Sequence, residues 1–472
     1  MTSATTLDIA APASAPATPV NPVNPGKAGK AGKVAKAAKP PGEQLSALFY
    51  TVWCGQAISM FGTMLTSFAL GVWLFQRTGS VLDFTQLTMF STMPALLLLP
   101  WTGSLADRLD RRTILIACDL LALVCVSAIG VLVWLDRFEL WQLFAVQTVL
   151  SIGMAFQGPA AYATITSIVN KSQFGRANGM FSMAGALSQI AAPLLAAGLL
   201  GAIGLAGIVV LDILSFFFAL SSLAIVTLPV NQKAPADPAR PKRSALRDLR
   251  WSFDFLRQRP TMALVYAYTS MGGFMAGMVI VLVTPLVLAM HSAGALAWIT
   301  TCGALGALLS GIVMVTWGGP RQFTPLVLMF NLLAGLAIAL AGVTQSVPVL
   351  CAASFAVMLS TTTLGTCMQA VWRRKVPRER QGSFAALQQA VQLSLIPLSA
   401  LAGGNLAHHV FEPALLPGGV WFDSVGAWFG SGKGRGTGFF FFTVGLAAAG
   451  LSLASLLQRR LYRLESEVPD AF

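Results

Sequence analysis

The sequence predicts an all-α membrane protein with about twelve transmembrane helices in two pseudo-symmetric six-helix bundles. Of the 472 residues, 55% are hydrophobic and only 10% are charged, whereas soluble domains carry about 25% charged residues. Long apolar runs recur along the chain, each close to the roughly 20 residues that a helix needs to cross a bilayer. The alternating pattern of about ten residues that is typical of outer-membrane strands does not occur in these runs.

The first segment, residues 1–45, is rich in alanine, proline and lysine, with lysines at Lys27, Lys30, Lys33, Lys36 and Lys39. It has too little apolar surface to fold, and it lacks the apolar core of a signal peptide. We therefore expect a disordered basic cytoplasmic tail. An alternative function for this segment is electrostatic attachment to anionic membrane lipid.

Six apolar runs follow, which we interpret as membrane spans at about 47–75, 84–105, 113–135, 140–168, 176–200 and 205–228. The composition then changes to a polar, proline-rich stretch over 229–243. From Ser244 to Arg259, apolar residues recur at helical spacing among arginines. This pattern predicts a cytoplasmic linker over 229–260 that contains an amphipathic helix at the membrane interface.

The second half contains six further spans, which we place near 261–290, 294–317, 323–343, 348–371, 381–406 and 437–458. Two short patterns recur between the halves. The heptapeptide from Val169 to Gly175 resembles that from Val376 to Gly382, and Trp101-Thr-Gly103 resembles Trp317-Gly-Gly319. These repeats predict an N-terminal bundle over 46–228 and a C-terminal bundle over 261–458 in parallel arrangement, followed by a cytoplasmic tail over 459–472.

The distribution of positive charge predicts the orientation in the membrane. The net charge is +13, and all but four of the 31 lysines and arginines fall in segments on one face of the predicted bundles. The other face receives only Arg77, Arg137, Lys433 and Arg435. By the positive-inside rule, both termini and the central linker are cytoplasmic, in the inner (plasma) membrane. The charge therefore reports orientation, and we expect no nucleic-acid partner.

A charged turn after the second span carries a family resemblance. It reads Gly103-Ser-Leu-Ala-Asp107-Arg108-Leu-Asp110-Arg111-Arg112, and so many charges must lie outside the hydrocarbon. The pattern resembles the loop 2–3 signature of the major facilitator superfamily of secondary transporters. The resemblance implies a conformational latch formed by Gly103, Asp107, Arg108, Arg111 and Arg112, with Asp107 at a helix N-terminus of the other half. The alternative is that the turn only sets the topology.

Two further patterns resemble one branch of this superfamily. Gly55-Gln56-Ala-Ile-Ser59-Met-Phe-Gly62 in the first span is similar to the start of macrolide, enterobactin and lysophospholipid transporters. Many members of this branch have an acid after the last glycine, but this chain has Thr63, so the resemblance transfers no proton site to the first span. Pro193 in the fifth span resembles the kink of antiporters, which favours export.

Two acids lie within predicted spans, Asp119 in the third and Asp212 in the sixth. An ionisable side chain is costly in hydrocarbon and usually faces a water-filled cavity or a partner. A carboxyl group at such a depth is suited to bind and release a proton as the cavity alternates, so both are proton-coupling candidates. The alternative is that each is a hydrogen-bonded polar anchor between helices.

Uncharged polar and aromatic side chains within the spans predict a substrate cavity. An amide in lipid requires a hydrogen-bond partner, so these residues should face the interior of the bundles. None of them resembles a cationic clamp for phosphate or carboxylate, so we expect a bulky amphipathic substrate. The candidates are Trp53, Gln56, Phe61, Gln147, Gln189, Tyr266, Tyr268, Asn331, Gln369, Gln388 and Gln392.

Together these features predict a proton-coupled secondary active efflux transporter of a drug, siderophore or peptide or polyketide natural product, working by alternating access. The expected partners are the small-molecule substrate, protons and membrane lipid, and we expect a monomer. We expect no enzyme activity, cofactor or metal, because no Ser/His/Asp set or metal-ligand spacing occurs among the cysteines and histidines. Alternatives are a lysophospholipid flippase or nutrient importer of the same fold, or a transport-inactive membrane scaffold or receptor.

Overall fold

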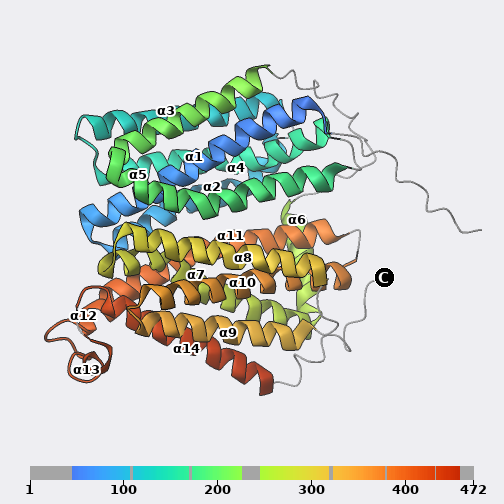
Figure 1. Ribbon diagram of the computed structural model, residues 1–472. Coiled ribbons are helices and arrows are strands. Elements are labelled where there is room, and N and C mark those ends of the chain that lie inside the picture. The colour runs from blue at the N-terminus through green and yellow to red at the C-terminus, as the bar shows by residue number, and fades with distance from the viewer. Residues whose placement is uncertain are drawn as a thin grey trace, which may run out of the picture. The chain divides into compact units, whose positions relative to one another are not determined.

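The computed structural model (Figure 1) describes residues 45–106, 110–169, 173–225, 245–317, 323–377, 380–430 and 432–457. Within these ranges the regular elements are helices and no strand occurs, which confirms the all-α prediction. The N-terminal tail expected over 1–45 lies outside the described residues apart from Leu45. The C-terminal tail expected over 459–472 lies outside them entirely.

Local capping groups fix several helix ends in the first half of the chain. The Ser46 side chain accepts a hydrogen bond from the Phe49 N–H before α1, which ends at Gly79 in the left-handed conformation (φ 62°). Asp110 accepts from the Thr113 N–H and so caps α3. The helices are α1 (Ala47–Thr78), α2 (Val81–Ala106), α3 (Arg111–Trp134), α4 (Leu140–Ile168) and α5 (Phe174–Ile225).

Helix α5 consists of two spans joined by a sharp turn. Its 52 residues would extend far beyond a bilayer core of about 30 Å at roughly 1.5 Å per residue. Gly204 interrupts it with φ 66° and ψ −175°, a conformation that a side chain would strain. Figure 1 shows the two green arms on either side of this turn. They correspond to the fifth and sixth predicted spans.

The second half begins with the linker helix α6, whose apolar face packs against α7 and α11, so protein covers part of the surface that we expected to face lipid. In Figure 1, α6 lies at the right of the bundle and the short helices α12 and α13 at the left. The elements are α6 (Ala245–Arg257), α7 (Pro260–Met290), α8 (Ala293–Trp317), α9 (Phe323–Val343), α10 (Val347–Lys375), α11 (Gln381–Leu406), a π-helical turn (Ala407–Phe411), α12 (Glu412–Ala414), α13 (Gly426–Phe429) and α14 (Arg435–Leu457).

Within the described residues, 11 helices are long and apolar enough to cross a membrane. Because α5 contains two arms, these helices supply the dozen crossings that the sequence predicts. In the first half, α1 packs against α5, α2 against α4, and α3 against α4 and α5. In the second half, α7 packs against α11, α8 against α10, and α9 against α10 and α14. The two sets correspond span by span, which confirms the two pseudo-symmetric bundles.

The glycines of the first-span motif allow α1 to approach the second arm of α5. A methyl group on Gly55 would lie 2.1 Å from Ser222 Oγ, and one on Gly62 would lie 2.4 Å from Ser215 Oγ. Small residues permit such close packing between membrane helices. Gly62 therefore brings α1 directly against the part of α5 that carries Asp212.

The two bundles contact each other through α2 with α11 and through α5 with α8. Thr301 on α8 donates a hydrogen bond to the Ile190 carbonyl of α5 at 2.9 Å. At the α2–α11 contact, a methyl group on Gly404 would lie 2.3 Å from Thr85 Oγ1. Both contacts place groups of opposite bundles in van der Waals range.

An apolar seal closes the bundles on the side of the turn between α1 and α2. We define this seal as the buried residues that the two bundles contribute to shared clusters there. They are Val72, Phe75 and Val81 from the first half and Met278, Val279, Leu282, Leu286, Val287, Leu296, Ile299, Ala337, Ile338, Leu350, Val357, Ala407, Phe440 and Phe441 from the second. Such packed apolar surface excludes water from this side of the molecule.

The last loop between membrane helices is also ordered by specific contacts. The Glu412 carboxylate accepts hydrogen bonds from the Gly434 N–H at 2.7 Å and from the Thr437 N–H at 3.0 Å. It therefore satisfies free backbone donors at the start of α14. Arg435 stacks over the Phe429 ring, with 5.4 Å from its guanidinium carbon to the ring centroid.

Candidate functional site

An inner cavity of about 210 Å³ lies within the second half, between α7, α9, α10, α11 and α14. Its 24 lining residues include no acidic, basic or histidine side chain. Six of the cavity candidates named from the sequence line it: Tyr266, Tyr268, Asn331, Gln369, Gln388 and Gln392. The cavity therefore combines amide and hydroxyl groups with apolar and aromatic surface.

A mouth cavity of about 590 Å³ adjoins the inner cavity at the end of α10 and the start of α11. The two cavities share Gln369, Trp372, Gln388 and Gln392. These four side chains therefore lie at the boundary between the inner cavity and the mouth. Arg373 supplies the mouth with a cation that the inner cavity lacks. The mouth lies at the opposite helix ends from the apolar seal.

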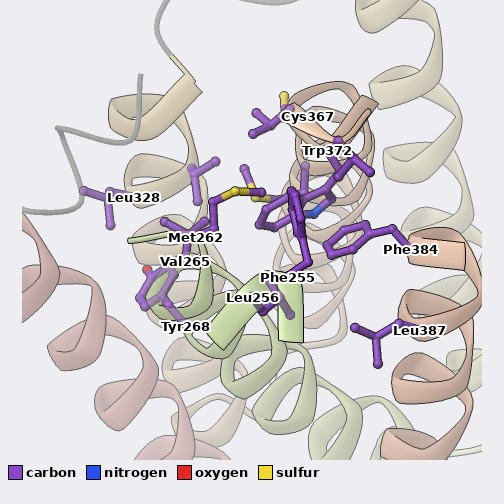
Figure 2. Packing of buried hydrophobic residues seen from close by; sticks show 14 residues of the cluster. Phe255, Leu256, Met262, Val265, Tyr268, Leu328, Cys367, Trp372, Phe384 and Leu387 are labelled. Atoms are coloured by element: carbon purple, nitrogen blue, oxygen red, sulfur yellow. The ribbon is translucent and has the colours of Figure 1, made fainter. Parts of the chain in front are cut away.

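Aromatic side chains of α6, α7, α10 and α11 pack together and form a wall beside the linker helix (Figure 2). The ring centroid of Trp372 lies 5.4 Å from that of Phe384 and 5.8 Å from that of Tyr266. Phe255 of α6 packs edge-on against Phe384, with 6.2 Å between centroids. Figure 2 shows Phe255, Phe384 and Trp372 close together, with Met262 and Val265 on the other side of the cluster. The linker helix thus supports the aromatic lining of the inner cavity.

The polar groups of the inner cavity fall into two classes. The hydroxyl of Tyr268 lies 3.0 Å from Ser452 Oγ and also interacts with the side chain of Asn331. The amides of Gln369, Gln388 and Gln392 hydrogen-bond no other protein group within the described part of the chain. Each of these amides retains two donors and one acceptor for water or a ligand.

Asp119 forms a closed hydrogen-bond network in the first half. Gln56 Nε2 donates to Asp119 Oδ2 at 3.1 Å, and Gln157 Nε2 donates to Asp119 Oδ1 at 3.0 Å. The network joins α1, α3 and α4, and only 1% of the Asp119 surface is exposed. Gln56, which we expected to line a cavity, is therefore bound to a residue expected to carry protons.

Asp212 has a less complete environment, although only 1% of its surface is exposed as well. Ser215 Oγ donates to Asp212 Oδ1 at 3.2 Å and to the Asp212 carbonyl at 2.7 Å. The Thr66 hydroxyl of α1 lies close enough to interact with the carboxyl group, but it falls outside hydrogen-bond geometry, so Thr66 Oγ1 and Asp212 Oδ2 both lack a hydrogen-bond partner in the described residues. Buried polar atoms are rarely left without a partner, so Oδ2 marks Asp212 as a site for a proton or a water molecule.

The other cavity candidates of the first half do not line either cavity. Trp53 packs in a cluster with Phe49, and Phe61 packs against the core between α1, α3 and α5. Gln147 is partly buried on α4, and Gln189 is exposed on α5. The structure does not bring these four residues together with the six that line the inner cavity.

Most of the predicted latch cannot be described structurally. Asp107 and Arg108 lie outside the described residues, as does the side chain of Arg111, while Gly103 lies in the last turns of α2. Arg112 Nη2 donates a hydrogen bond to the Ala224 carbonyl at 3.0 Å. The last carbonyls of a helix lack intrahelical partners, so Arg112 caps the end of α5 within its own bundle.

Several lining residues were not predicted from the sequence. Trp372 follows Gln369 by three positions and so shares its helix face, a spacing that points to Trp372 once Gln369 is chosen. Met368 and Ser452 carry no comparable signal, because an apolar or small residue in an apolar helix is indistinguishable from its neighbours. In the part of the chain that the structure describes, no group of three or more His, Cys, Asp or Glu residues forms a metal site.

A model of the family described as Major Facilitator Superfamily matches residues 52–400 of this chain. Macrolide efflux protein A of Streptococcus pyogenes is 30% identical over 181 residues, which are 38% of this chain and 45% of that protein. The match thus spans less than half of that relative. The MFS-type transporter YfiS of Bacillus subtilis is 27% identical over 391 residues, covering 76% of this chain and 87% of that one.

Solved structures of transporters share the fold at low sequence identity. The nucleoside transporter NupG has a TM-score of 0.66 and 11% identity, covering 86% of this chain and 99% of that chain. A bacterial homologue of the human lysosomal transporter Spinster, in an inward-facing and unoccupied conformation, has a TM-score of 0.60 and 16% identity. The latter comparison covers 89% of this chain and 95% of that chain.

Proposed function

The chain belongs to the major facilitator superfamily, and from this premise we propose that it is a proton-coupled exporter of a bulky amphipathic small molecule that works by alternating access. The observation that carries this proposal is the separation of two kinds of site. An uncharged cavity lined by amides and aromatic rings lies in the second half, and two buried carboxyl groups lie in the first. Substrate and proton thus have distinct binding places in opposite bundles.

The chemistry of the cavities supports an amphipathic substrate. None of the described residues that line the inner cavity is charged, and burying an unpaired charge there would be costly. Ligand pockets of drug-sized molecules are about 300–1,000 Å³, and the mouth cavity of about 590 Å³ lies in that range. The partial match to a protein named for macrolide efflux supports export as the direction.

Asp212 is the proposed proton carrier. It combines burial with an oxygen that lacks a hydrogen-bond partner, and it lies where α1 packs on the second arm of α5. A proton on Oδ2 removes the cost of a buried charge, and its release requires contact with water. Movement between α1 and α5 during alternation would supply that contact. Asp119, whose two oxygens are already occupied by amides, is proposed as a structural anchor and only secondarily as a coupling site.

The proposed orientation follows from the distribution of positive charge along the sequence. The protein lies in the inner membrane, and both termini, the linker and the mouth cavity face the cytoplasm. We propose bundles over 46–228 and 261–458 as the moving units of a monomer. In this orientation the described conformation is closed outward by the apolar seal and open inward at the mouth. The latch at Gly103 to Arg112 is proposed to stabilise the alternative, inward-closed conformation.

The test is dye export by purified protein in proteoliposomes that carry an imposed proton gradient. We expect export against the dye gradient, which a protonophore abolishes. Asp212→Asn should reduce export to the rate seen with the protonophore, because an amide cannot release a proton. Asp136→Asn is the matched control, since Asp136 is exposed and its φ of 53° is one that Asn tolerates.

Unchanged proton-driven export by Asp212→Asn would remove Asp212 from the coupling site. Lysophospholipid movement without any proton gradient would contradict proton-coupled export and favour a flippase. Export by the Asp136→Asn variant should equal that of the unsubstituted protein, so a loss there would show that the assay reports general damage.

A further inference from the structure

We propose that the inner cavity binds an uncharged ring bearing several hydroxyl groups, of the size of one glycosyl unit, while the remainder of the transported molecule occupies the mouth cavity. This inference rests on the proposed function and specifies its substrate. It concerns the part of the ligand that the second half recognises. It follows from the charge, hydrogen-bonding capacity, shape and volume of the cavity.

The absence of charge among the inner-cavity residues excludes a recognised cation or anion at this position. None of its 24 described lining residues is acidic, basic or histidine, and the cation Arg373 lines the mouth instead. A charged group entering the inner cavity would lose hydration without gaining a counter-ion. The recognised group is therefore neutral, even if the rest of the molecule carries a charge.

The free hydrogen-bonding groups match hydroxyls. Gln369, Gln388 and Gln392 line the inner cavity where it adjoins the mouth, and their amides hydrogen-bond no other protein group in the described residues. An amide offers donors and an acceptor side by side, and a hydroxyl group both donates and accepts. Three such amides from α10 and α11 can therefore bind several hydroxyls of one ring, whereas a purely apolar ring would leave them without partners.

Aromatic and apolar side chains supply the remaining surface. Tyr266, Trp372 and Met368 line the cavity, and the last two belong mostly to the buried apolar cluster beside it. A saturated ring with hydroxyls at its rim still presents C–H groups on its two faces. Rigid aromatic side chains provide large contact area at low cost in conformational entropy.

The volume limits how much of the substrate enters. A cavity of about 210 Å³ is smaller than the roughly 300–1,000 Å³ of sites that enclose a whole drug-sized ligand. This smaller size suits one ring with its substituents better than the whole molecule. The adjoining mouth, of about 590 Å³, receives the bulkier apolar part.

The experiment measures binding to the full-length protein in lipid nanodiscs by equilibrium dialysis, without a proton gradient. Four probes share a nitrophenyl group: 4-nitrophenyl β-D-glucopyranoside, 4-nitroanisole, 4-nitrophenethylammonium and 4-nitroacetanilide. Empty nanodiscs correct for partition into lipid. We expect the glucoside to bind about tenfold or more tightly than each of the other three, from the hydrogen bonds that only its hydroxyls make.

Two substitutions test whether the amides recognise the hydroxyls. Gln388→Leu and Gln392→Leu should each weaken glucoside binding roughly 3- to 10-fold, the equivalent of one hydrogen bond, and should not weaken binding of 4-nitroanisole, which has no hydroxyl. Gln76→Leu is the matched control, because Gln76 is exposed on α1 and lines neither cavity. It should bind all four probes like the unsubstituted protein.

Equal or tighter binding of the ammonium probe or of the neutral amide would overturn the inference, as would glucoside binding that is insensitive to both glutamine substitutions. The binding and transport measurements distinguish failure of this inference from failure of the proposed function. Proton-driven dye export without a preference for the glucoside contradicts only this inference. A glucoside preference in a protein that does not use the proton gradient contradicts only the proposed function.

Discussion

At the scale of single residues, the two buried carboxyl groups differ in how completely they are hydrogen-bonded. Both Asp119 oxygens accept from glutamine amides, whereas Asp212 Oδ2 has no partner in the described residues. A carboxylate with both oxygens bound gains little from a proton, because protonation would replace an accepted hydrogen bond. The difference therefore assigns anchoring to one acid and proton exchange to the other.

If Asp119 is an anchor, its substitution by alanine and its substitution by asparagine should have different effects on stability. Asp119→Ala should destabilise the protein, because it leaves the Gln56 and Gln157 amides without their acceptor, at a cost of about 1–3 kcal/mol for each buried donor. Asp119→Asn should be nearly neutral, since the glutamine amides can rotate to accept from the new N–H groups. The measurements are the thermal unfolding midpoint of the purified protein and proton-driven dye export.

Asp119→Asn should export dye at nearly the rate of the unsubstituted protein, unlike Asp212→Asn. An Asp119→Asn variant that unfolds normally but has lost proton-driven export would make Asp119 a coupling residue and contradict its assignment as an anchor.

The sequence predicted residues of the inner cavity better than it predicted the side-chain contacts of the first half. Polar and aromatic side chains within apolar runs were expected to face the interior of the bundles. Six of the residues chosen on that ground line the inner cavity. The pairing of Gln56 with Asp119 joins positions 63 residues apart, and no local spacing reveals such a contact. Trp53 and Phe61 pack in apolar clusters, because an aromatic ring alone does not distinguish core from cavity.

At the scale of helices, length and hydrophobicity were sufficient to locate the spans. The differences lie at the ends, as in α10, which continues to Lys375 beyond the expected end near 371. The basic residues Arg373, Arg374 and Lys375 of its last turn are favourable at a helix C-terminus. The amphipathic pattern predicted α6, but not that α7 and α11 would cover its apolar face, because periodicity does not identify a partner.

The contact of α6 with the aromatic wall predicts that this linker helix affects substrate binding. Phe255 is 6% exposed and packs against Phe384, which in turn contacts Trp372 of the inner cavity. Phe255→Ala should cost about 3–5 kcal/mol of stability, as expected for a buried aromatic residue. It should also weaken binding of the nitrophenyl glucoside, since Phe384 and Trp372 lose their support.

Phe253 provides the matched control on the same helix, because its side chain is 64% exposed. Phe253→Ala should change stability by no more than about 0.5 kcal/mol and leave probe binding unchanged. The measurements are the unfolding midpoint and equilibrium dialysis. If Phe255→Ala lowered the midpoint but bound the glucoside with undiminished affinity, α6 would be a structural element without influence on the cavity.

At the scale of the whole molecule, each span of the first bundle has a counterpart in the second. The two bundles meet at two contacts that are also counterparts of each other. The contact of α2 with α11 corresponds to that of α8 with α5. The sequence repeats predicted two parallel halves but could not predict which helices join them, because the joining surfaces are apolar like the lipid-facing ones. Alternating access requires that the bundles separate on the sealed side and close on the side of the mouth.

A disulfide across the sealed side should therefore arrest transport. Positions 85 and 404 suit this test, because a Cβ on Gly404 would lie 2.8 Å from the Thr85 Cβ, so the two helices need to move apart by only about 1 Å to reach the spacing of a disulfide. In Thr85→Cys/Gly404→Cys, oxidation should stop proton-driven dye export, and reduction should restore it. Binding of the nitrophenyl glucoside should persist in the oxidised form, because the inner cavity lies within one bundle.

A second pair separates the effect of arrest from that of cross-linking itself. Gly55→Cys/Ser222→Cys has the same separation, with 2.8 Å from a Cβ on Gly55 to the Ser222 Cβ, but it joins α1 to α5 within the first bundle. Oxidation of this pair should leave export intact, because helices of one bundle move together. Continued export by the oxidised Thr85→Cys/Gly404→Cys variant would contradict alternation between the bundles, since the molecule would then transport while its sealed side stays closed.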